Sequence, residues 1–356
     1  MSTSVIDDLY RYNDWANGRV FQLCGGLTAA QLDQPRTMGL GSLRATLHHL
    51  LAAERIWWER WIGDPWRAFD IDPAGASPDA IERDLSRIAE LRRGLIDRER
   101  ASNWKRVVQY KDSKGNQHAN LLDDLLLHVA NHGIHHRAQA LSYLKGLGRT
   151  VPAGLDYIFY RLARPTVAQA PSVADAMRGY GLEINSGPGY EVDWDPQRVR
   201  YYFAYHDWAV ERLIDKAIPL NAEQLDRPID IGPGSIRKTL LHLHDAERWW
   251  LRNWTTGTSA FERSPLATSL TDLRDAWAQT AERRNRFIAD LTAEGSQRIV
   301  TVDASGALVS VRVIESLIQL CCHGTHHRAQ LLNMLRQVGT QAGELDLIVW
   351  VRGRQE

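Results

Sequence analysis

The sequence predicts an all-α protein made of two tandem up-down four-helix bundles. Three observations carry this prediction. The second half of the 356-residue chain repeats the first, and most apolar residues in each half recur at intervals of three and four, which is typical of amphipathic helices. In each half one short segment instead alternates apolar and polar residues around a glycine, which indicates a small β-hairpin.

The internal repeat is clear at both ends of each half. YNDWAN at 12–17 returns as YHDWAV at 205–210, 193 residues later, and HGIHHRAQALSYLKGLG at 132–148 returns as HGTHHRAQLLNMLRQVG at 323–339, 191 residues later. Two residues have therefore been lost between these segments in the second copy. The chain is a tandem duplication, so its halves can be compared position by position.

The elements follow in the same order in both halves. Helices are expected in the first half near 4–24, 41–62, 78–100 and 119–146, and in the second near 196–216, 234–256, 269–292 and 313–338. A β-hairpin is expected before each fourth helix, at 104–118 and 299–312, and a short last helix after each bundle, at 155–163 and 345–353. The domains are then 1–163 and 196–356. The segment between them, 164–195, is expected to be a linker because it mixes Pro, Gly and small residues without a sustained period.

Charge and composition exclude several classes of function. The 43 basic and 43 acidic side chains cancel, so no general nucleic-acid binding is expected. Three cysteines cannot form a disulfide framework, which suits a reducing cytoplasm. The first residues lack the pattern of a secretory signal, and no apolar run approaches the length of about 20 that spans a bilayer. We therefore expect a cytoplasmic protein without a membrane partner.

Histidines at helical spacing predict two metal sites. Residues four apart on a helix share a face, so His132 and His136 in the first half can converge on one ion. His323 and His327 have the same spacing, and the second helix of each half supplies one histidine that coincides under the repeat. The expected ligand sets are His49, His132 and His136, and His242, His323 and His327. Three imidazoles that leave a coordination position open are typical of a catalytic metal site.

Other polar residues near these histidines are weaker candidates. His128 lies one turn before His132 and is a candidate base or extra ligand, but Gln319 stands at its position in the second half. His135 and His326 match across the halves but are rotated off the ligand face, so hydrogen bonding is expected. Asp245 is a candidate to orient His242, although Ala52 replaces it in the first half.

Two arginines follow the last ligands directly. Arg137 and Arg328 are candidates either for binding an anionic substrate or for salt bridges to the matched Glu54 and Glu247. The tryptophans of the second helices are expected in the core, with some of them walling an apolar pocket. Cys321 and Cys322 are expected to be buried structural residues.

The motifs resemble a known family. YNDWAN on the first helix, HHLLAAERIWW at 48–58 on the second and HGIHHRAQ at 132–139 on the fourth resemble the DinB/YfiT-like metal-binding four-helix bundles, over about 1–163 and again 196–353. In that family one histidine of the second helix and two of the fourth bind the metal. The resemblance therefore implies the same six ligands that the spacing indicates.

The resemblance also implies a class of activity. Relatives use a divalent metal and a low-molecular-weight thiol, so the expected cofactors are one Zn²⁺, Ni²⁺ or Fe²⁺ per bundle and a thiol co-substrate, since a bound metal lowers the pKa of a thiol. A thiol-dependent transferase or isomerase, or an enzyme that detoxifies a small electrophile, is the leading hypothesis. The alternatives are a metal-dependent hydrolase and a non-catalytic, stress-associated metal- or ligand-binding protein. Because single-domain relatives pair as dimers, the chain is expected to be an intramolecular pseudo-dimer, either monomeric or weakly dimeric.

Overall fold

The computed structural model describes residues 2–63, 76–102, 104–150, 155–165, 167–169, 171–179, 189–258, 260–304 and 307–354. The chain is predominantly helical, as predicted, and its described residues divide into two compact units. We call residues 9–151 and 344–356 the N-unit, and residues 1–8 and 152–343 the C-unit. Within the described residues no helix is long and apolar enough to cross a membrane.

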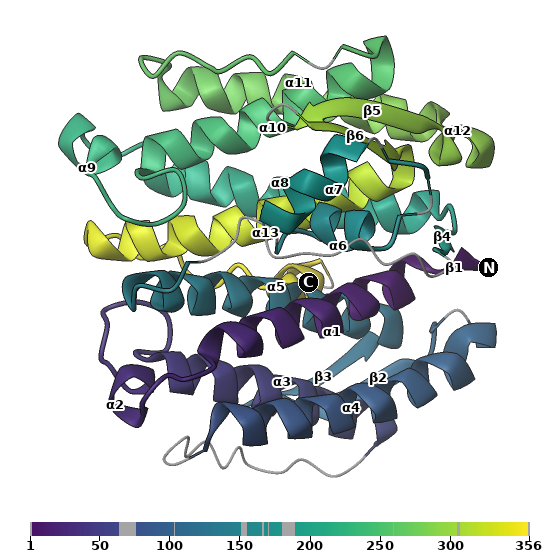
Figure 1. Ribbon diagram of the computed structural model, residues 1–356, viewed down its shortest axis with the longest axis vertical. Helices are drawn as coiled ribbons and strands as arrows, with labels where there is room; N and C mark the ends of the chain where they lie inside the picture. Colours follow the sequence, from purple (N-terminus) through teal and green to yellow (C-terminus); the bar gives the residue numbers. More distant parts are fainter. Residues whose placement is uncertain are drawn as a thin grey trace. The chain divides into compact units, whose positions relative to one another are not determined.

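The N-unit contains the helices α1 (Val5–Cys24, from Leu9 on), α2 (Ala29–Leu32), α3 (Leu43–Ile62), α4 (Pro78–Glu99), α5 (Leu122–Gly146) and α14 (Leu347–Gly353), with a 3₁₀ turn at Arg100–Ser102. Its antiparallel hairpin, β2 (Val107–Lys111) and β3 (Gln117–Leu121), pairs Tyr110 with His118 and leads directly into α5. Helix α3 packs against both α4 and α5. This packing places the second and fourth long helices of the unit side by side (Figure 1).

The C-unit repeats this order with additions. Its helices are α6 (Tyr157–Ala163), α7 (Pro171–Gly179), α8 (Pro196–Ala217), α9 (Ala222–Asp226), α10 (Ile236–Thr256), α11 (Leu270–Asp290), α12 (Ala293–Gln297) and α13 (Val313–Gln337). The hairpin β5 (Ile299–Ala304) and β6 (Ala307–Arg312) pairs Val302 with Val309 and leads into α13. A short parallel pair joins β1 (Ser2–Thr3) to β4 (Glu191–Val192). Helix α13 packs against α8 and α10.

The same local signals start and stop the matched ligand-bearing helices. Ser42 caps α3 by accepting a hydrogen bond from the backbone N–H of Ala45, and Ser235 caps α10 in the same way through Lys238. Both helices end at a glycine with positive φ, Gly63 at 79° and Gly257 at 69°. Serine before the helix and glycine after it thus fix where the second helix of each half begins and ends.

The compact units do not coincide with the sequence halves 1–163 and 196–356, because the short helices are exchanged. Helix α6, at the end of the first copy in sequence, packs on α13 in the C-unit, and α14, at the end of the second copy, packs on α5 in the N-unit. In the C-unit, Arg161 of α6 forms buried ion pairs with Asp8 and Glu315. The segment 164–195, expected to be a linker, contains α7 and β4.

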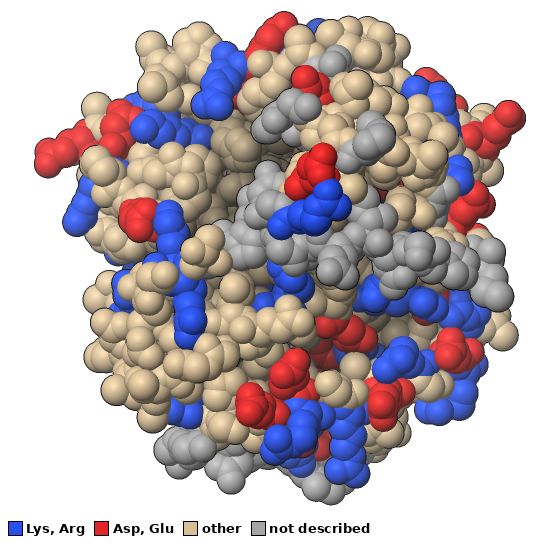
Figure 2. Space-filling model, in the orientation of Figure 1, with Lys and Arg blue, Asp and Glu red and all other residues tan. Residues whose placement is uncertain are grey.

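Charged side chains of both signs are interspersed on the face in Figure 2, with no broad area of one sign. This distribution agrees with the zero net charge of the sequence.

Candidate metal centres

The structure brings both predicted histidine sets together. In the N-unit the ligand atoms of His49, His132 and His136 all lie within 4.8 Å of one another, and the Nε2 atoms of His49 and His132 are 3.2 Å apart. The first histidine comes from α3 and the other two from successive turns of α5. Spacing along one helix therefore supplied the pair, and packing of α3 on α5 supplied the third member.

The C-unit cluster has the same geometry. The ligand atoms of His242, His323 and His327 lie within 4.8 Å of one another, and the Nε2 atoms of His242 and His323 are 3.1 Å apart. Here α10 and α13 replace α3 and α5. The two centres are thus built from matched residues on matched helices.

A glutamine fixes one ring in each centre. The Nδ1 of His136 lies 2.9 Å from Gln139 Oε1, and the Nδ1 of His327 lies 2.8 Å from Gln330 Oε1. Because a carbonyl oxygen only accepts, each Nδ1 carries the proton and each Nε2 keeps its lone pair for the centre.

The neighbouring histidine orients that glutamine. The amide nitrogen of Gln139 lies 2.9 Å from His135 Nε2, and that of Gln330 lies 2.9 Å from His326 Nε2. The expected hydrogen-bonding role of His135 and His326 therefore has a specific partner. The sequence signal is H-H-R-A-Q, which stands unchanged in both halves.

A carboxylate orients a second ring in the C-unit. Asp156 Oδ2 lies 3.0 Å from His323 Nδ1 and also accepts a hydrogen bond from Gln319 Nε2 at 3.2 Å. Burial raises the pKa of Asp156, but hydrogen bonds and the nearby imidazoles lower it to about 2. The group is therefore an anion at neutral pH. A carboxylate on the far nitrogen of a ligating histidine is a common support for a metal site.

Sequence reasoning proposed Asp245 for this task and missed Asp156. Asp245 instead accepts hydrogen bonds from the backbone N–H and hydroxyl of Ser264, and so holds the segment after α10. Asp156 lies at the start of α6, which the sequence assigns to the end of the first copy. The detectable signal was the repeat of Leu-Asp at 155–156 and 345–346.

His128 lies near an aspartate, Asp346, whose counterpart in the C-unit is Asp156. Asp346, the match of Asp156, lies close enough to His128 for the two groups to influence each other's pKa. Burial raises the pKa of Asp346, and proximity to His128 opposes that rise. Burial lowers the pKa of His128 to about 4, and its ring centroid lies 5.7 Å from that of His132. His128 therefore lies near Asp346 at the start of α14, as Gln319 lies near Asp156 at the start of α6.

The donor set fits a divalent metal ion. Burial and neighbouring imidazoles lower the pKa of His49 and His242 to about 4, and hold those of His132, His136 and His327 well below the usual range, so these rings are neutral at pH 7. Two nitrogens bound to one ion at about 2.0–2.1 Å lie about 2.9–3.4 Å apart for angles between 90° and 109°. The observed separations of 3.2 and 3.1 Å lie in this range.

The two matched arginines are buried and hold helices together. Arg137 Nη1 donates to Asn13 at 2.5 Å and to Asn17 at 3.0 Å, and Arg328 Nη1 lies 2.8 Å from His206 Nδ1. These contacts join α5 to α1 and α13 to α8, so they account for both arginines without a substrate. Glu54 and Glu247, the expected partners in salt bridges, pair with Arg92 and Arg284.

The two glutamates pair instead with arginines of the third long helices. Arg92 contacts Glu54 and Asp14, while Arg284 donates to Glu247 at 2.9 Å and to Asp207 at 2.5 Å. The ligand atoms of His206, Asp207 and Glu247 also lie within 4.8 Å of one another, but both carboxylates are already paired with the guanidinium of Arg284. We interpret this third group as a structural ion-pair network.

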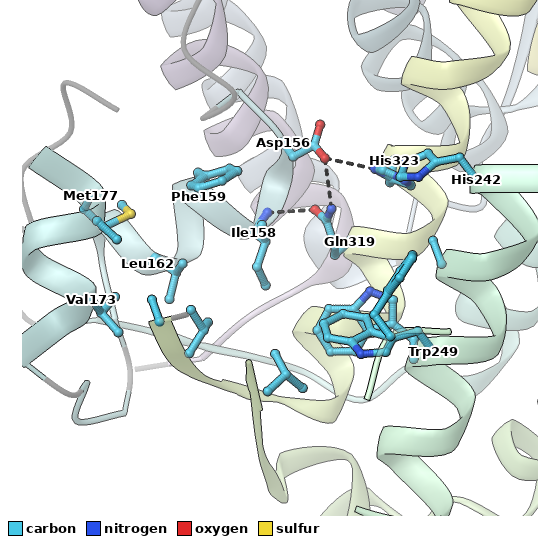
Figure 3. A pocket seen from close by; sticks show the side chains of 17 residues that line it. Asp156, Ile158, Phe159, Leu162, Val173, Met177, His242, Trp249, Gln319 and His323 are labelled. Carbon is cyan, nitrogen blue, oxygen red and sulfur yellow. Dashed lines mark hydrogen bonds and ion pairs between the residues drawn. The ribbon is translucent and has the colours of Figure 1, made fainter. Parts of the chain in front are cut away.

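A cavity of about 310 Å³ opens beside the C-unit centre (Figure 3). His242, His323, Asp156 and Gln319 form its polar end. The remaining wall is apolar and comes from α6, α7, α10, β5 and β6, with Phe159, Met177 and Trp249 among its members. The expectation that tryptophans of the second helix wall an apolar pocket therefore agrees with Trp249 and Trp250.

Comparison with known proteins defines the class. The model of the DinB family matches residues 1–166 and 196–353. The chain therefore belongs to the DinB family and carries two copies of its domain, each with a three-histidine cluster that can hold a metal ion. No curated protein and no solved structure gave a significant match.

Proposed function

We propose that the protein is a metal-dependent enzyme that uses a low-molecular-weight thiol to transform a small electrophile. The observation that carries this proposal is the position of the His242, His323 and His327 cluster at the polar end of an otherwise apolar cavity. A structural metal site has no need of a cavity, whereas a catalytic one requires room for a substrate beside an open coordination position. Within this proposal each unit is an up-down four-helix bundle that holds one centre.

The chain's own residues have separate tasks in this proposal. Three Nε2 atoms per unit hold the ion, which is zinc, nickel or ferrous iron, since imidazole suits all three. Gln330 and Asp156 keep the rings of His327 and His323 in the required tautomer and orientation. The apolar wall excludes water and positions the substrate next to His242 and His323.

When bound, the ion supplies Lewis acidity that lowers the pKa of a coordinated thiol or water. The cysteines do not compete for the role of nucleophile. Cys24, Cys321 and Cys322 are all buried, and burial raises the pKa of Cys24 to about 12 and that of Cys321 well above its usual range. The nucleophile is therefore not a cysteine of the chain, and in this proposal a small thiol from solution takes that role.

The test is an activity screen on protein loaded separately with Zn²⁺, Ni²⁺ or Fe²⁺. Each form is mixed with a panel of small thiols and an aryl halide, an epoxide or an isomerisable unsaturated acid, and loss of thiol or change in the electrophile is followed. The proposal requires turnover that depends on both metal and thiol and that is lost in the double variant His136→Ala/His327→Ala. Turnover that persists without thiol would instead identify a hydrolase. Metal binding without thiol binding or turnover would identify a non-catalytic binder.

A further inference from the structure

The duplication allows the surroundings of the two centres to be compared position by position. The hairpins have the same register, since Tyr110 pairs with His118 in the N-unit where Val302 pairs with Val309 in the C-unit. The short helices match from Leu-Asp onward, so Leu162 of α6 corresponds to Arg352 of α14. Differences between the halves at these positions therefore change the space beside each centre.

In the C-unit these positions are apolar and line the cavity. Leu162, Val302 and Val309 all contribute to its wall. The polar residue Gln319 also lines the cavity. Its Oε1 accepts a hydrogen bond from the backbone N–H of Ile158, and its Nε2 donates one to Asp156. Both ends of that amide are thus occupied by helix α6.

In the N-unit the matched positions carry polar and aromatic side chains that contact one another. Arg352 Nη2 donates to the hydroxyl of Tyr110 at 3.1 Å, and the rings of Tyr110 and His118 are 5.5 Å apart. Trp57 lies 5.1 Å from Tyr110 and 5.1 Å from His128, ring centroid to ring centroid. The guanidinium of Arg60 lies over the Trp57 ring at 4.6 Å. Among the described residues of the N-unit, polar and aromatic side chains that contact one another thus stand at positions whose counterparts line the C-unit cavity.

We propose that the two centres have diverged, and that the C-unit cavity binds an uncharged, largely apolar small molecule which the N-unit does not accept. This inference deepens the proposed function, on which it rests for the idea that the bound molecule is the substrate. Binding in the cavity itself depends on its wall and not on the metal, so it can be tested separately.

The chemistry of the wall defines the ligand class. No lysine or arginine is among the described residues that line the cavity. In the metal-free protein a carboxylate, phosphate or sulfonate would lose its hydration there without gaining a cation. The indole rings of Trp249 and Trp250 and the ring of Phe159 instead offer apolar surface to a planar group. A volume of about 310 Å³ lies at the small end of typical ligand pockets.

The experiment compares a neutral and an anionic aromatic probe on the full-length chain. N-phenyl-1-naphthylamine is uncharged, and 8-anilinonaphthalene-1-sulfonate carries a sulfonate on a similar frame. Fluorescence titrations are carried out on chelator-treated and on metal-loaded protein. We expect one equivalent of the neutral probe to bind per chain in both forms. The anionic probe should bind at least about tenfold more weakly than the neutral one to the chelator-treated protein, where its charge has no partner.

Variants connect this binding to the cavity. Leu162→Arg introduces the residue of the matched N-unit position and is expected to weaken binding of the neutral probe at least about tenfold. Leu162→Met keeps an apolar side chain of similar volume and should retain binding. Ala246→Leu fills the cavity without adding charge and should also weaken binding, whereas Ala53→Leu, the same change at the matched N-unit position, should not. Circular dichroism checks that each variant is folded. If Leu162→Arg does not fold, the probe binding of Ala246→Leu decides the test.

Several results would overturn the inference: no saturable binding of the neutral probe, two equivalents per chain, tighter binding of the anionic probe to the chelator-treated protein, or binding that survives Ala246→Leu. Failure of the proposed function looks different. In that case the neutral probe still binds and responds to the variants, but the protein holds no metal or the metal-loaded protein has no turnover.

Discussion

Replacing Asp156 by asparagine tests how a residue outside the ligand set supports the C-unit centre. Its carboxylate accepts the Nδ1 proton of His323 at 3.0 Å and is an anion, since its pKa is about 2. Asparagine keeps the shape and an oxygen acceptor but removes the charge. The ring of His323 can keep its orientation, but it loses the electrostatic support that makes its Nε2 a stronger donor to a metal.

The structure sets the expected magnitude. Loss of such a supporting partner weakens metal affinity by about 10- to 100-fold, or about 1.4–2.7 kcal/mol. The side chain of Asp156 is 23% exposed, so solvent screens part of its charge. The substituted amide also still accepts a hydrogen bond, though one about half as strong. We therefore expect a loss of about tenfold for Asp156→Asn and a larger loss, toward about 100-fold, for Asp156→Ala.

The assay is a competition titration against a chromophoric chelator. It is carried out in a His136→Ala background, so that only the C-unit centre binds. The matched control is Asp346→Asn in a His327→Ala background, where the aspartate faces His128, which is not one of the three expected ligands. We expect a loss of about threefold or less in the control. Equal affinities before and after Asp156→Asn, or equal losses in the two units, would refute the assigned role of Asp156.

Further expectations concern the buried network and the thiols. Glu247→Gln should lower the free energy of unfolding by about 3 kcal/mol, measured by urea denaturation, because Arg284 would lose the buried one of its two carboxylate partners. His206→Asn should cost only about 1 kcal/mol or less, since Asn13 makes the matched contacts in the N-unit. Burial raises the pKa of Glu247, but Arg284 and His206 outweigh it and leave that pKa at about 2, below the ordinary 4.5. The ionised carboxylate therefore stabilises the fold fully above pH 4.5, and this stabilisation is lost as the pH falls toward 2. The stability difference between the native chain and Glu247→Gln should accordingly shrink between pH 6 and pH 3; an unchanged difference would contradict this. Cys321 should resist iodoacetamide at pH 8 until the chain is unfolded, because burial raises its thiol pKa, and rapid labelling of the native protein would argue against that burial.

Much of the helical order and both histidine clusters were predictable from the sequence. Helix α5 runs from Leu122 to Gly146 where the periodicity predicts 119–146, and α10 runs from Ile236 to Thr256 where it predicts 234–256. Both helices are long and periodic, and α10 is also capped by Ser235 and ends at Gly257, so local signals decide them. The ligand pairs needed only helical spacing, and the duplication selected the third histidine.

What could not be predicted depends on packing between distant segments. Sequence order assigns α6 to the first copy, so nothing local indicates that Asp156 reaches His323. The partner of Glu247 depends on how α11 is rotated against α10, which places Arg284 there and turns Arg328 toward α8. The cavity depends on the volumes of several side chains at once. In each case the residue can be read from the sequence, but its contact depends on packing between segments that are distant in the chain.

The most direct test of the central claim is elemental analysis of protein purified without chelators, combined with the ligand variants. The two clusters require two equivalents of a divalent transition metal per chain, one equivalent in His136→Ala or in His327→Ala, and none in the double variant. A native chain without metal that also fails to take up Zn²⁺, Ni²⁺ or Fe²⁺, or a double variant that retains two equivalents, would contradict the account.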